Sequence, residues 1–292
     1  NYNIKRAVQL GLPVEKALKM ATIQAARCYG LSRLGAIAPG YQADFTVLDN
    51  LKDLNVLEVY HKGRKILAES HGNIPPCPPD LKQTVHLDHF SQEQLILPHA
   101  GGKAHVLQMI GGQIVTEDLR EEVPFQKTEK GNVFIPEGGY LKIAAVERHK
   151  NTGKTGVGIV KGFGIKGGAI ASSVSHDSHN LIVIGDNDRD MYLAVRELIR
   201  TQGGYTLVEN GKVYETLPLP IMGLMSDAGY ETVNKVLKKM IAKAYEMGIP
   251  KDFDPFITLS FMALPVVPEI RITPRGVYLV KEERLLKTPF EQ

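Results

Sequence analysis

The sequence predicts an α+β protein whose larger part is built on a mainly antiparallel sheet. Between residues 104 and 184, short apolar segments of strand character alternate with glycine-containing turns. Helical periodicity returns only after these strands, over residues 191–201 and 231–247. A run of strands followed by helices is typical of α+β folds, whereas regular alternation of strands and helices would predict a parallel sheet.

The first 68 residues predict a smaller segment of helices and short strands. Apolar residues at helical spacing predict one helix before Pro13 and a second between Pro13 and Gly30. Proline is tolerated at a helix start, and glycine is favoured just after a helix end. Three short strands are then expected over residues 43–49, 56–60 and 64–68.

A proline-rich segment at residues 74–80 holds four prolines in seven positions. It cannot form a helix or a central strand, because proline lacks the backbone N–H and has a fixed φ. We therefore expect a linker here. Beyond it, the expected strands are 104–110, 113–116, 140–147, 155–160, 168–174 and 181–184.

The composition of the 292 residues is that of a globular protein, with 43% apolar and 23% charged residues. Lys and Arg number 35 against 32 Asp and Glu, so nucleic acid is not an expected partner. No long apolar window or signal-peptide core occurs, and we expect a cytoplasmic protein with no membrane partner. The two cysteines, Cys28 and Cys77, are too few for a disulfide framework or a thiolate metal site.

Two glycine motifs resemble nucleotide-binding signatures only in part. Gly162–Gly167 has the pattern G-x-G-x-x-G, and Asp186 follows it at about twenty residues. A dinucleotide site needs a helix directly after the glycines, but residues 168–180 are rich in serine and turn formers. We expect a glycine-rich turn. Residues 153–155, Gly-Lys-Thr, match the last three residues of a phosphate-binding loop. Arg148, however, stands where that motif needs a glycine.

Residues 172–180 place two imidazoles, one carboxylate and four hydroxyls between two apolar strands. Such groups at a strand end can bind a divalent metal, move a proton or hydrogen-bond a polar heterocycle. The alternative is structural, with His176 and His179 in a turn and Asp177 and Ser178 capping backbone groups. A Ser-His-Asp hydrolase is disfavoured, because no G-x-S-x-G motif is present.

Three other segments predict structure rather than chemistry. Glu147, Arg148 and His149 at a strand end predict a surface ion pair. The Leu-Pro-Leu-Pro stretch before Ser226 and Asp227 predicts a rigid approach to a helix cap. The apolar run 255–265 predicts buried packing.

Five segments resemble bacterial adenine deaminase, a metal-dependent hydrolase family of the amidohydrolase superfamily. Residues 20–26 and 35–45 are similar to the end of an amidohydrolase barrel and its small β-sandwich. The segments that look like the family's C-terminal domain are 162–180, 217–227 and 255–269.

The resemblance implies a fold made of three parts. Residues 1–30 would be the last helices of a TIM-type barrel, 31–79 a segment of the β-sandwich with the proline-rich linker, and 80–292 an α/β C-terminal domain with a mainly antiparallel sheet. The similarity is weakest between about residues 70 and 135.

The resemblance also implies an activity, the hydrolytic deamination of adenine to hypoxanthine and ammonia in purine salvage. In this family a hydroxide on a binuclear divalent metal centre, Mn²⁺ or Fe²⁺, attacks the ring carbon that bears the amino group. A nearby acid donates a proton as charge develops on the ring.

The family's metal ligands lie on barrel strands and include a His-x-His pair, which does not occur in this sequence. We therefore expect no metal ligand in this chain, and an enzyme that begins upstream of Asn1, with these 292 residues inactive alone. His176, Asp177 and His179 remain the candidate catalytic residues, either facing the substrate or positioning groups that do.

Two other function classes stay open. One is a non-catalytic module that buries surface in a homo-oligomer, and the other is a nucleotide-binding protein that uses the Gly162–Gly167 turn. Zinc deaminases of the cytidine type are disfavoured, because neither their H-x-E pair nor a P-C-x-x-C motif occurs.

Overall fold

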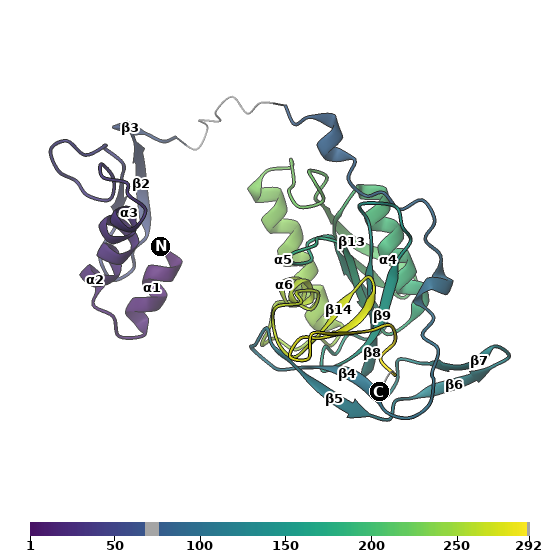
Figure 1. The fold of residues 1–292 in the computed structure, drawn as a ribbon. Coiled ribbons are helices and arrows are strands. Elements are labelled where there is room, and N and C mark those ends of the chain that lie inside the picture. The colour runs from purple at the N-terminus through teal and green to yellow at the C-terminus, as the bar shows by residue number, and fades with distance from the viewer. Residues whose placement is uncertain (68–75, 291–292) are drawn as a thin grey trace. The chain divides into compact units, whose positions relative to one another are not determined.

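The computed structural model describes residues 1–67 and 76–290, in two units, Asn1–Pro76 and Cys77–Gln292 (Figure 1). The end of the third expected strand, at Ala68, and the start of the expected linker, at residues 74 and 75, lie outside the described residues. Across the described ranges, no helix combines the length and the apolar character needed to cross a bilayer.

The helices of the Asn1–Pro76 unit follow the predicted pair. Helix α1 covers Tyr2–Gln9, and α2 begins at Val14, directly after Pro13. Helix α2 ends at Lys19 and continues through a π-helical turn, Met20–Gln24, into α3, Ala25–Cys28. Gly30 then takes a positive φ of 69°, as expected for a residue that ends a helix.

The Asn1–Pro76 unit also contains a three-stranded antiparallel sheet in the order β1-β2-β3. Its strands are Phe45–Leu48, Val56–His61 and Arg64–Lys65. The turn between β2 and β3 is Lys62-Gly63, and both residues have positive φ, which matches the twist of a tight hairpin. The buried hydrophobic residues among the described part of this unit are Ala17, Ala26 and Leu54.

The Cys77–Gln292 unit is built on an eight-stranded sheet in the order β13-β12-β10-β11-β8-β9-β4-β5. All neighbouring pairs are antiparallel except β4 and β9. The strands are β4 (Ala104–Met109), β5 (Thr116–Glu121), β8 (Tyr140–Val146), β9 (Thr155–Lys161), β10 (Gly168–Ser172), β11 (Leu181–Gly185), β12 (Gly204–Glu209) and β13 (Lys212–Pro218).

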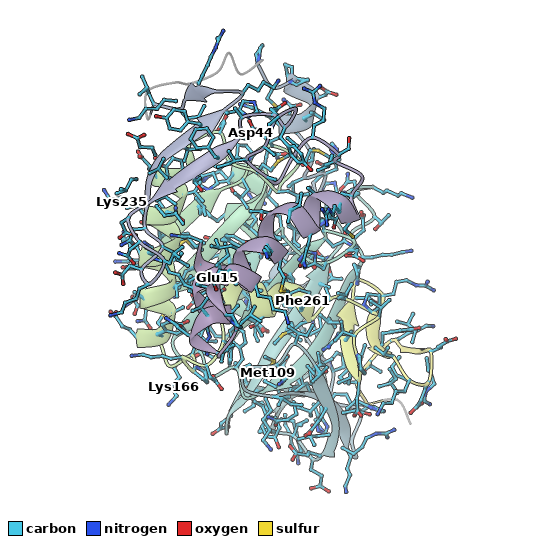
Figure 2. The ribbon with its side chains drawn as sticks, turned by 90° about the vertical axis from the view of Figure 1, so that its left-hand side faces the viewer. Glu15, Asp44, Met109, Lys166, Lys235 and Phe261 are labelled. Carbon is cyan, nitrogen blue, oxygen red and sulfur yellow. The ribbon has the colours of Figure 1, made fainter. Side chains whose placement is uncertain are left out.

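Both faces of this sheet are buried, with helices on each side (Figure 1). Helix α4, Asp188–Thr201, covers one face. The other face packs against α5 (Tyr230–Glu246), against α6 (Pro255–Phe261), and against a small antiparallel sheet of β14 (Ile270–Thr273), β15 (Gly276–Leu279) and β16 (Arg284–Leu286). Figure 2 shows Met109 of β4 and Phe261 at the end of α6 within this unit.

Successive side chains of each strand point to opposite faces of the large sheet, and each face has its own hydrophobic core. In β8, Ile143 and Ala145 belong to the core that contains α5 and α6, whereas Ala144 and Val146 belong to the core that contains α4. A separate hairpin, β6 (Phe125–Thr128) and β7 (Gly131–Phe134), and short 3₁₀ turns at Pro79–Lys82 and Gln92–Leu95 complete the described unit.

The mixed α+β architecture and mostly antiparallel pairing are as predicted. The expected strands 104–110, 140–147, 155–160, 168–174 and 181–184 all form, with ends shifted by at most two residues. The prediction of a strand over 113–116 is wrong, because β5 begins only at Thr116.

Of three further expectations about elements, one is refined, one is wrong and one is confirmed. Helix α4 begins at Asp188, before the expected Met191, because the Asn187 side chain accepts a hydrogen bond from the Asp190 backbone N–H and caps the first turn. The prediction that Ser226 and Asp227 cap a helix is wrong, since the residue before α5 is Gly229 and Asp227 pairs with Lys82 at 2.6 Å. The run 255–265 is largely buried, as predicted.

Candidate functional site

The polar segment 173–180 connects β10 to β11, two neighbouring central strands of the large sheet. Its first serines have structural partners. The Ser172 hydroxyl accepts from the Val174 N–H at 2.9 Å, and the Ser173 hydroxyl donates to the Gly223 carbonyl at 2.6 Å. The rest of the segment projects from the sheet as a loop, which we call the histidine loop, residues 175–180.

Arg148, two residues after the end of β8, is buried and fixes the position of the histidine loop through hydrogen bonds. The residue is 2% exposed, and its guanidinium donates to the carbonyls of His179, Thr84 and Met222. Burial lowers the Arg148 pKa to about 10, partly opposed by the nearby Glu147 charge, so the group remains charged at neutral pH. All of these acceptors are neutral carbonyls. Because they belong to three separate chain segments, the buried guanidinium links those segments.

The expectation of a surface ion pair at Glu147–His149 is wrong. The Arg148 side chain is buried, while the Glu147 carboxylate accepts backbone N–H bonds from His149, Lys150 and Thr152. Burial opposes ionisation of Glu147, but these hydrogen bonds outweigh it and lower the carboxyl pKa to about 2. Glu147 therefore closes a turn, and His149 donates its Nε2–H to the Ser178 carbonyl of the loop at 2.8 Å.

His176 and His179 contact each other, and His176 lies against the end of α6. Their ring centroids are 5.6 Å apart at an angle of 64°, and the His176 ring lies 5.0 Å from that of Phe261. The His176 N–H donates to the Ser260 carbonyl at 3.1 Å, so the loop is anchored at the end of this helix. Burial, followed by the charges of His176 and Arg148, lowers the His179 pKa below its ordinary value of 6.5. His179 is therefore neutral at pH 7, and its buried Nδ1 has no hydrogen-bond partner in the described structure.

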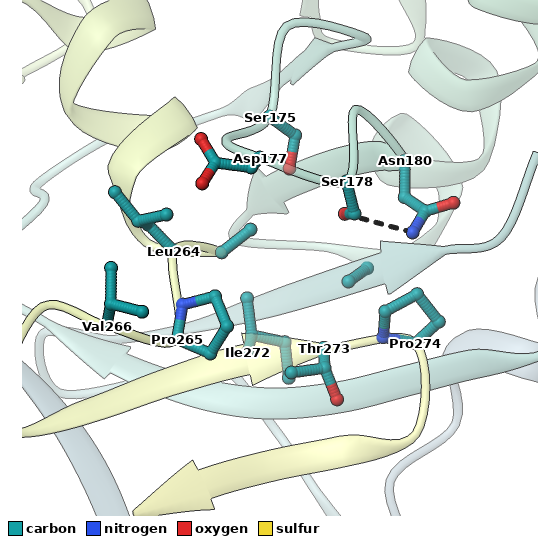
Figure 3. A pocket seen from close by; sticks show the side chains of 12 residues that line it. Ser175, Asp177, Ser178, Asn180, Leu264, Pro265, Val266, Ile272, Thr273 and Pro274 are labelled. Carbon is teal, nitrogen blue, oxygen red and sulfur yellow. Dashed lines mark hydrogen bonds between the residues drawn. The ribbon is translucent and has the colours of Figure 1, made fainter. Parts of the chain in front are cut away.

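Asp177 lies at the exposed edge of this imidazole pair. Its side chain is 85% exposed, and its carboxylate lies 3.9 Å from His176 Nδ1. It lines a cavity of about 220 Å³ together with Ser175, Ser178 and Asn180. Figure 3 shows these four side chains along one side of the cavity.

We call this cavity the Ser175 slot. Its opposite side is mostly apolar and comes from the segment after α6, from β14 and from the turn after β14, with Leu264, Pro265, Val266, Ile272 and Pro274 facing the polar side (Figure 3). Thr273 also lines this side, and its hydroxyl donates to the Gly276 carbonyl at 2.9 Å. Ser175 is completely buried, and its hydroxyl is without a hydrogen-bond partner in the part of the chain that the structure describes. Native proteins leave few buried polar atoms unpaired, so this hydroxyl is an exception in the loop.

The structure thus keeps the three predicted site residues close together on one loop but gives them different surroundings. His176 and His179 contact each other beside Phe261, whereas Asp177 faces the Ser175 slot, which neither imidazole lines. Within the described residues, no group of three or more His, Cys, Asp or Glu side chains is placed to hold a metal ion. The chemical roles of His176, Asp177 and His179 remain predictions.

Sequence reasoning missed the two residues that give this region its structure. The sequence predicts Arg148 in a surface ion pair at a strand end, and no local pattern shows that acceptors from residues 84, 179 and 222 converge on it. Ser175 was one of several serines, and only the fold distinguishes its unpaired hydroxyl from those of Ser172 and Ser173.

The glycine motif is a turn, as predicted. Strand β10 begins at Gly168, directly after the motif, and no helix follows. The Asp186 carboxylate accepts hydrogen bonds from the backbone N–H groups of Gly167 and Gly168. Asp186, which stands at the spacing expected of a residue that binds ribose, therefore stabilises the glycine turn instead. These hydrogen bonds give the motif a structural role.

Comparison with known families gives two matches. The adenine deaminase C-terminal domain family matches residues 113–284, and the amidohydrolase family matches residues 2–66. The first match contains the histidine loop and both sides of the Ser175 slot.

Curated relatives agree with these matches. An adenine deaminase of Desulfitobacterium hafniense is 50% identical over 287 residues, which cover 98% of this chain and 50% of that protein. Adenine deaminases of Halalkalibacterium halodurans and Petrotoga mobilis are 41% and 40% identical over 287 residues, 95% and 96% of this chain. The chain spans about half the length of these relatives, 50%, 48% and 50% respectively. By the match that covers most of its larger unit, the chain belongs to the adenine deaminase C-terminal domain family.

Proposed function

We propose that this chain is the C-terminal part of an enzyme that hydrolyses adenine to hypoxanthine and ammonia. The observation that carries the proposal is the 50% identity to an adenine deaminase over 98% of this chain. In this proposal residues 1–30 end an amidohydrolase barrel, 31–79 belong to its β-sandwich and linker, and 80–292 form the C-terminal domain.

The described residues of this chain do not fit a metal centre, because they bring no three ligand-type side chains together. We therefore assign the divalent metal of the proposed reaction, Mn²⁺ or Fe²⁺ in a binuclear centre, to residues upstream. When bound there, the metal would supply hydroxide near neutral pH. This chain contributes groups that contact or position the purine.

The histidine loop provides groups suited to that task. His179 is neutral at pH 7 and can donate or accept a hydrogen bond, whereas the Asp177 carboxylate accepts hydrogen bonds from an amino group. We propose that His176, Asp177 and His179 line or cover the purine site, which loops of this kind do when they close over a barrel enzyme's pocket. The proposal extends to a cytoplasmic homo-oligomer that acts in purine salvage.

Substitution in the full-length enzyme tests the role of the loop. We expect His176→Ala and His179→Ala to lower kcat/KM for adenine by about tenfold or more, with an unchanged melting temperature. His89→Ala, which changes an exposed histidine of the same unit, is the matched control and should leave both unchanged. Normal kinetics and stability in both loop variants would leave the histidines with a structural role only.

The fragment itself tests the assignment of the metal centre. We expect the purified 292-residue chain to release no ammonia from adenine, even with added Mn²⁺ or Fe²⁺. Ammonia release at a rate near that of a full-length enzyme would contradict the proposal that the reacting centre lies upstream.

A further inference from the structure

Next to the histidine loop, the guanidinium of Arg148 joins three chain segments, at a point that we call the arginine junction. Its Nε–H donates to the His179 carbonyl, its Nη1 to the Thr84 carbonyl at 2.8 Å and its Nη2 to the Met222 carbonyl at 3.0 Å. Each of these three nitrogen atoms thus bonds a different segment. A guanidinium is a rigid planar fork, so its acceptors are held at fixed positions relative to one another. The junction therefore fixes where His179 lies relative to the other two segments.

The two outer segments of the arginine junction are also bonded to each other without Arg148. The Met222 N–H donates to the Leu81 carbonyl at 2.6 Å, and Lys82 pairs with Asp227 at 2.6 Å. Neither contact involves the histidine loop. Loss of the guanidinium would therefore leave these two segments joined, whereas the histidine loop would lose this link to both.

The other end of the histidine loop has a separate anchor. The His176 N–H donates to the Ser260 carbonyl at 3.1 Å, and the His176 ring lies 5.0 Å from that of Phe261. The two imidazoles, with centroids 5.6 Å apart, thus bring together one residue held by α6 and one held by Arg148. The geometry of the pair depends on both anchors.

Gly223 leaves the space that the guanidinium occupies. A Cβ at this position would lie 3.0 Å from the Cζ and from both terminal nitrogens of Arg148, and the Gly223 φ is 71°. That distance is shorter than ordinary van der Waals contact, so a methyl group would displace the guanidinium by a few tenths of an ångström. The Ser173 hydroxyl donates to the Gly223 carbonyl at 2.6 Å and holds this backbone in place.

From this arrangement we propose that Arg148 is a positioning residue that holds the ring of His179 in place against His176. Gly223 leaves room for it. The Arg148 side chain is 2% exposed and bonds backbone carbonyls, so it acts through the imidazole pair rather than on a bound molecule. Its effect on catalysis rests on the proposed function, whereas its effect on the geometry of the imidazole pair does not.

Kinetics of the full-length enzyme test the proposal, at a temperature at which every variant is folded. The two junction variants are Arg148→Lys and Gly223→Ala. Arg148→Lys keeps a buried cation but lacks the planar fork, and it should lower kcat for adenine about tenfold, because misplaced groups lose reactivity steeply with distance. Gly223→Ala should lower kcat about threefold, because the guanidinium moves less.

Gly229→Ala is the matched control for the second variant. Gly229 also has a positive φ, 78°, but a Cβ there would meet nothing within 4 Å. The control therefore has the same backbone strain without a contact to Arg148, and its kcat should equal that of the wild type. A wild-type kcat in both junction variants would overturn the proposal.

A multiple-variant cycle tests whether Arg148 acts through the imidazoles. In an enzyme that already carries His176→Ala and His179→Ala, the rings that Arg148 positions are absent. Arg148→Lys should then lower kcat by no more than about twofold. A further loss of about tenfold in that background would show that Arg148 acts through other groups, and would overturn the proposal.

Imidazole chemical shifts of the 292-residue chain provide a readout that needs no activity. Both junction variants should move the ring resonances of His179, whereas Gly229→Ala should leave them in place. The exposed His89 should show no change in any variant. A purely structural role of Arg148 would lower the melting temperature without moving the ring resonances of the folded protein. Unmoved His179 resonances in both junction variants would overturn the proposal.

The outcomes separate this proposal from the proposed function. Moved His179 resonances, with no deamination of adenine by the full-length protein, would refute the proposed function and leave the positioning role. Deamination of adenine with a wild-type kcat in both junction variants would refute the positioning role and leave the proposed function.

Discussion

The two units of the chain differ sharply in how they bury apolar side chains. In Cys77–Gln292, both faces of the central sheet are covered, and residues such as Ile184 and Leu198 are completely buried. In Asn1–Pro76, apolar residues on the short strands, among them Leu57 and Val59, are 64% and 39% exposed. A sheet that exposes apolar residues lacks the covering layer that stable domains provide. The comparison agrees with the proposal that the first unit belongs to a larger barrel and sandwich.

Truncation of one apolar strand residue in each unit gives the largest expected contrast. We expect Ile184→Ala to lower the free energy of unfolding of the Cys77–Gln292 unit by about 2–5 kcal/mol, because it removes buried methylenes and leaves a cavity. Leu57→Ala should change the stability of the chain by no more than about 0.5 kcal/mol. Denaturant unfolding, analysed as separate transitions for the two units, measures both. A loss at Leu57 as large as that at Ile184 would contradict the difference in burial.

Arg148 tests whether the larger unit depends on a buried cation as well as on apolar packing. We expect Arg148→Met to lower the free energy of unfolding by about 2–3 kcal/mol, because the carbonyls of Thr84, His179 and Met222 lose their donor. Arg200→Ala removes an exposed arginine paired with Glu197 on α4 and should cost less than about 1 kcal/mol. Equal effects in the two variants would argue against the joining role of Arg148.

The smallest expected effect concerns pH and the turn that follows β8. The Glu147 carboxyl pKa is lowered from 4.5 to about 2 in the folded chain, so folding favours its ionised form. Its stabilisation is complete above pH 4.5 and is lost as the pH falls from 4.5 toward 2. Because the side chain is partly exposed, we expect Glu147→Gln to cost only about 1 kcal/mol at pH 7. Urea unfolding of both proteins from pH 7 to 3 should show this difference shrinking below pH 4.5; a difference that is constant with pH would contradict the assignment.

The sequence alone predicts the positions of those strands whose apolar runs end at glycine or polar turns. Strands β8 and β11 are buried on both faces, so nearly every residue is apolar and the run itself marks the strand. Strand β13 was not predicted because its residues alternate in polarity only weakly and it ends in Pro218. Proline is tolerated there because β13 is an edge strand, a position that depends on the whole sheet.

The candidate site was predictable in its residue types but not in its geometry. The cluster of His176, Asp177 and His179 was visible as an unusual polar run between apolar strands. Its division between an imidazole pair and a slot depends on α6 and β14, which lie about 80 to 100 residues further along the chain. Contacts over such separations come from the tertiary fold, which local patterns do not contain.

The position of β9 has a consequence for synthesis of the chain on the ribosome. Strand β9 lies between β8 and β4, and it pairs with β4 in parallel, although β4 ends at Met109 and β9 begins only at Thr155. The β4–β5 hairpin, which contains Leu107 and Met109, is therefore synthesised before β9. Until β9 has been made, the edge of β4 that pairs with it stays unpaired and these two side chains stay exposed. Long-range pairing of this kind forms slowly and leaves apolar strands open to misassociation. The nascent β4–β5 hairpin is thus a segment of this domain that is open to misassociation before β9 has been made.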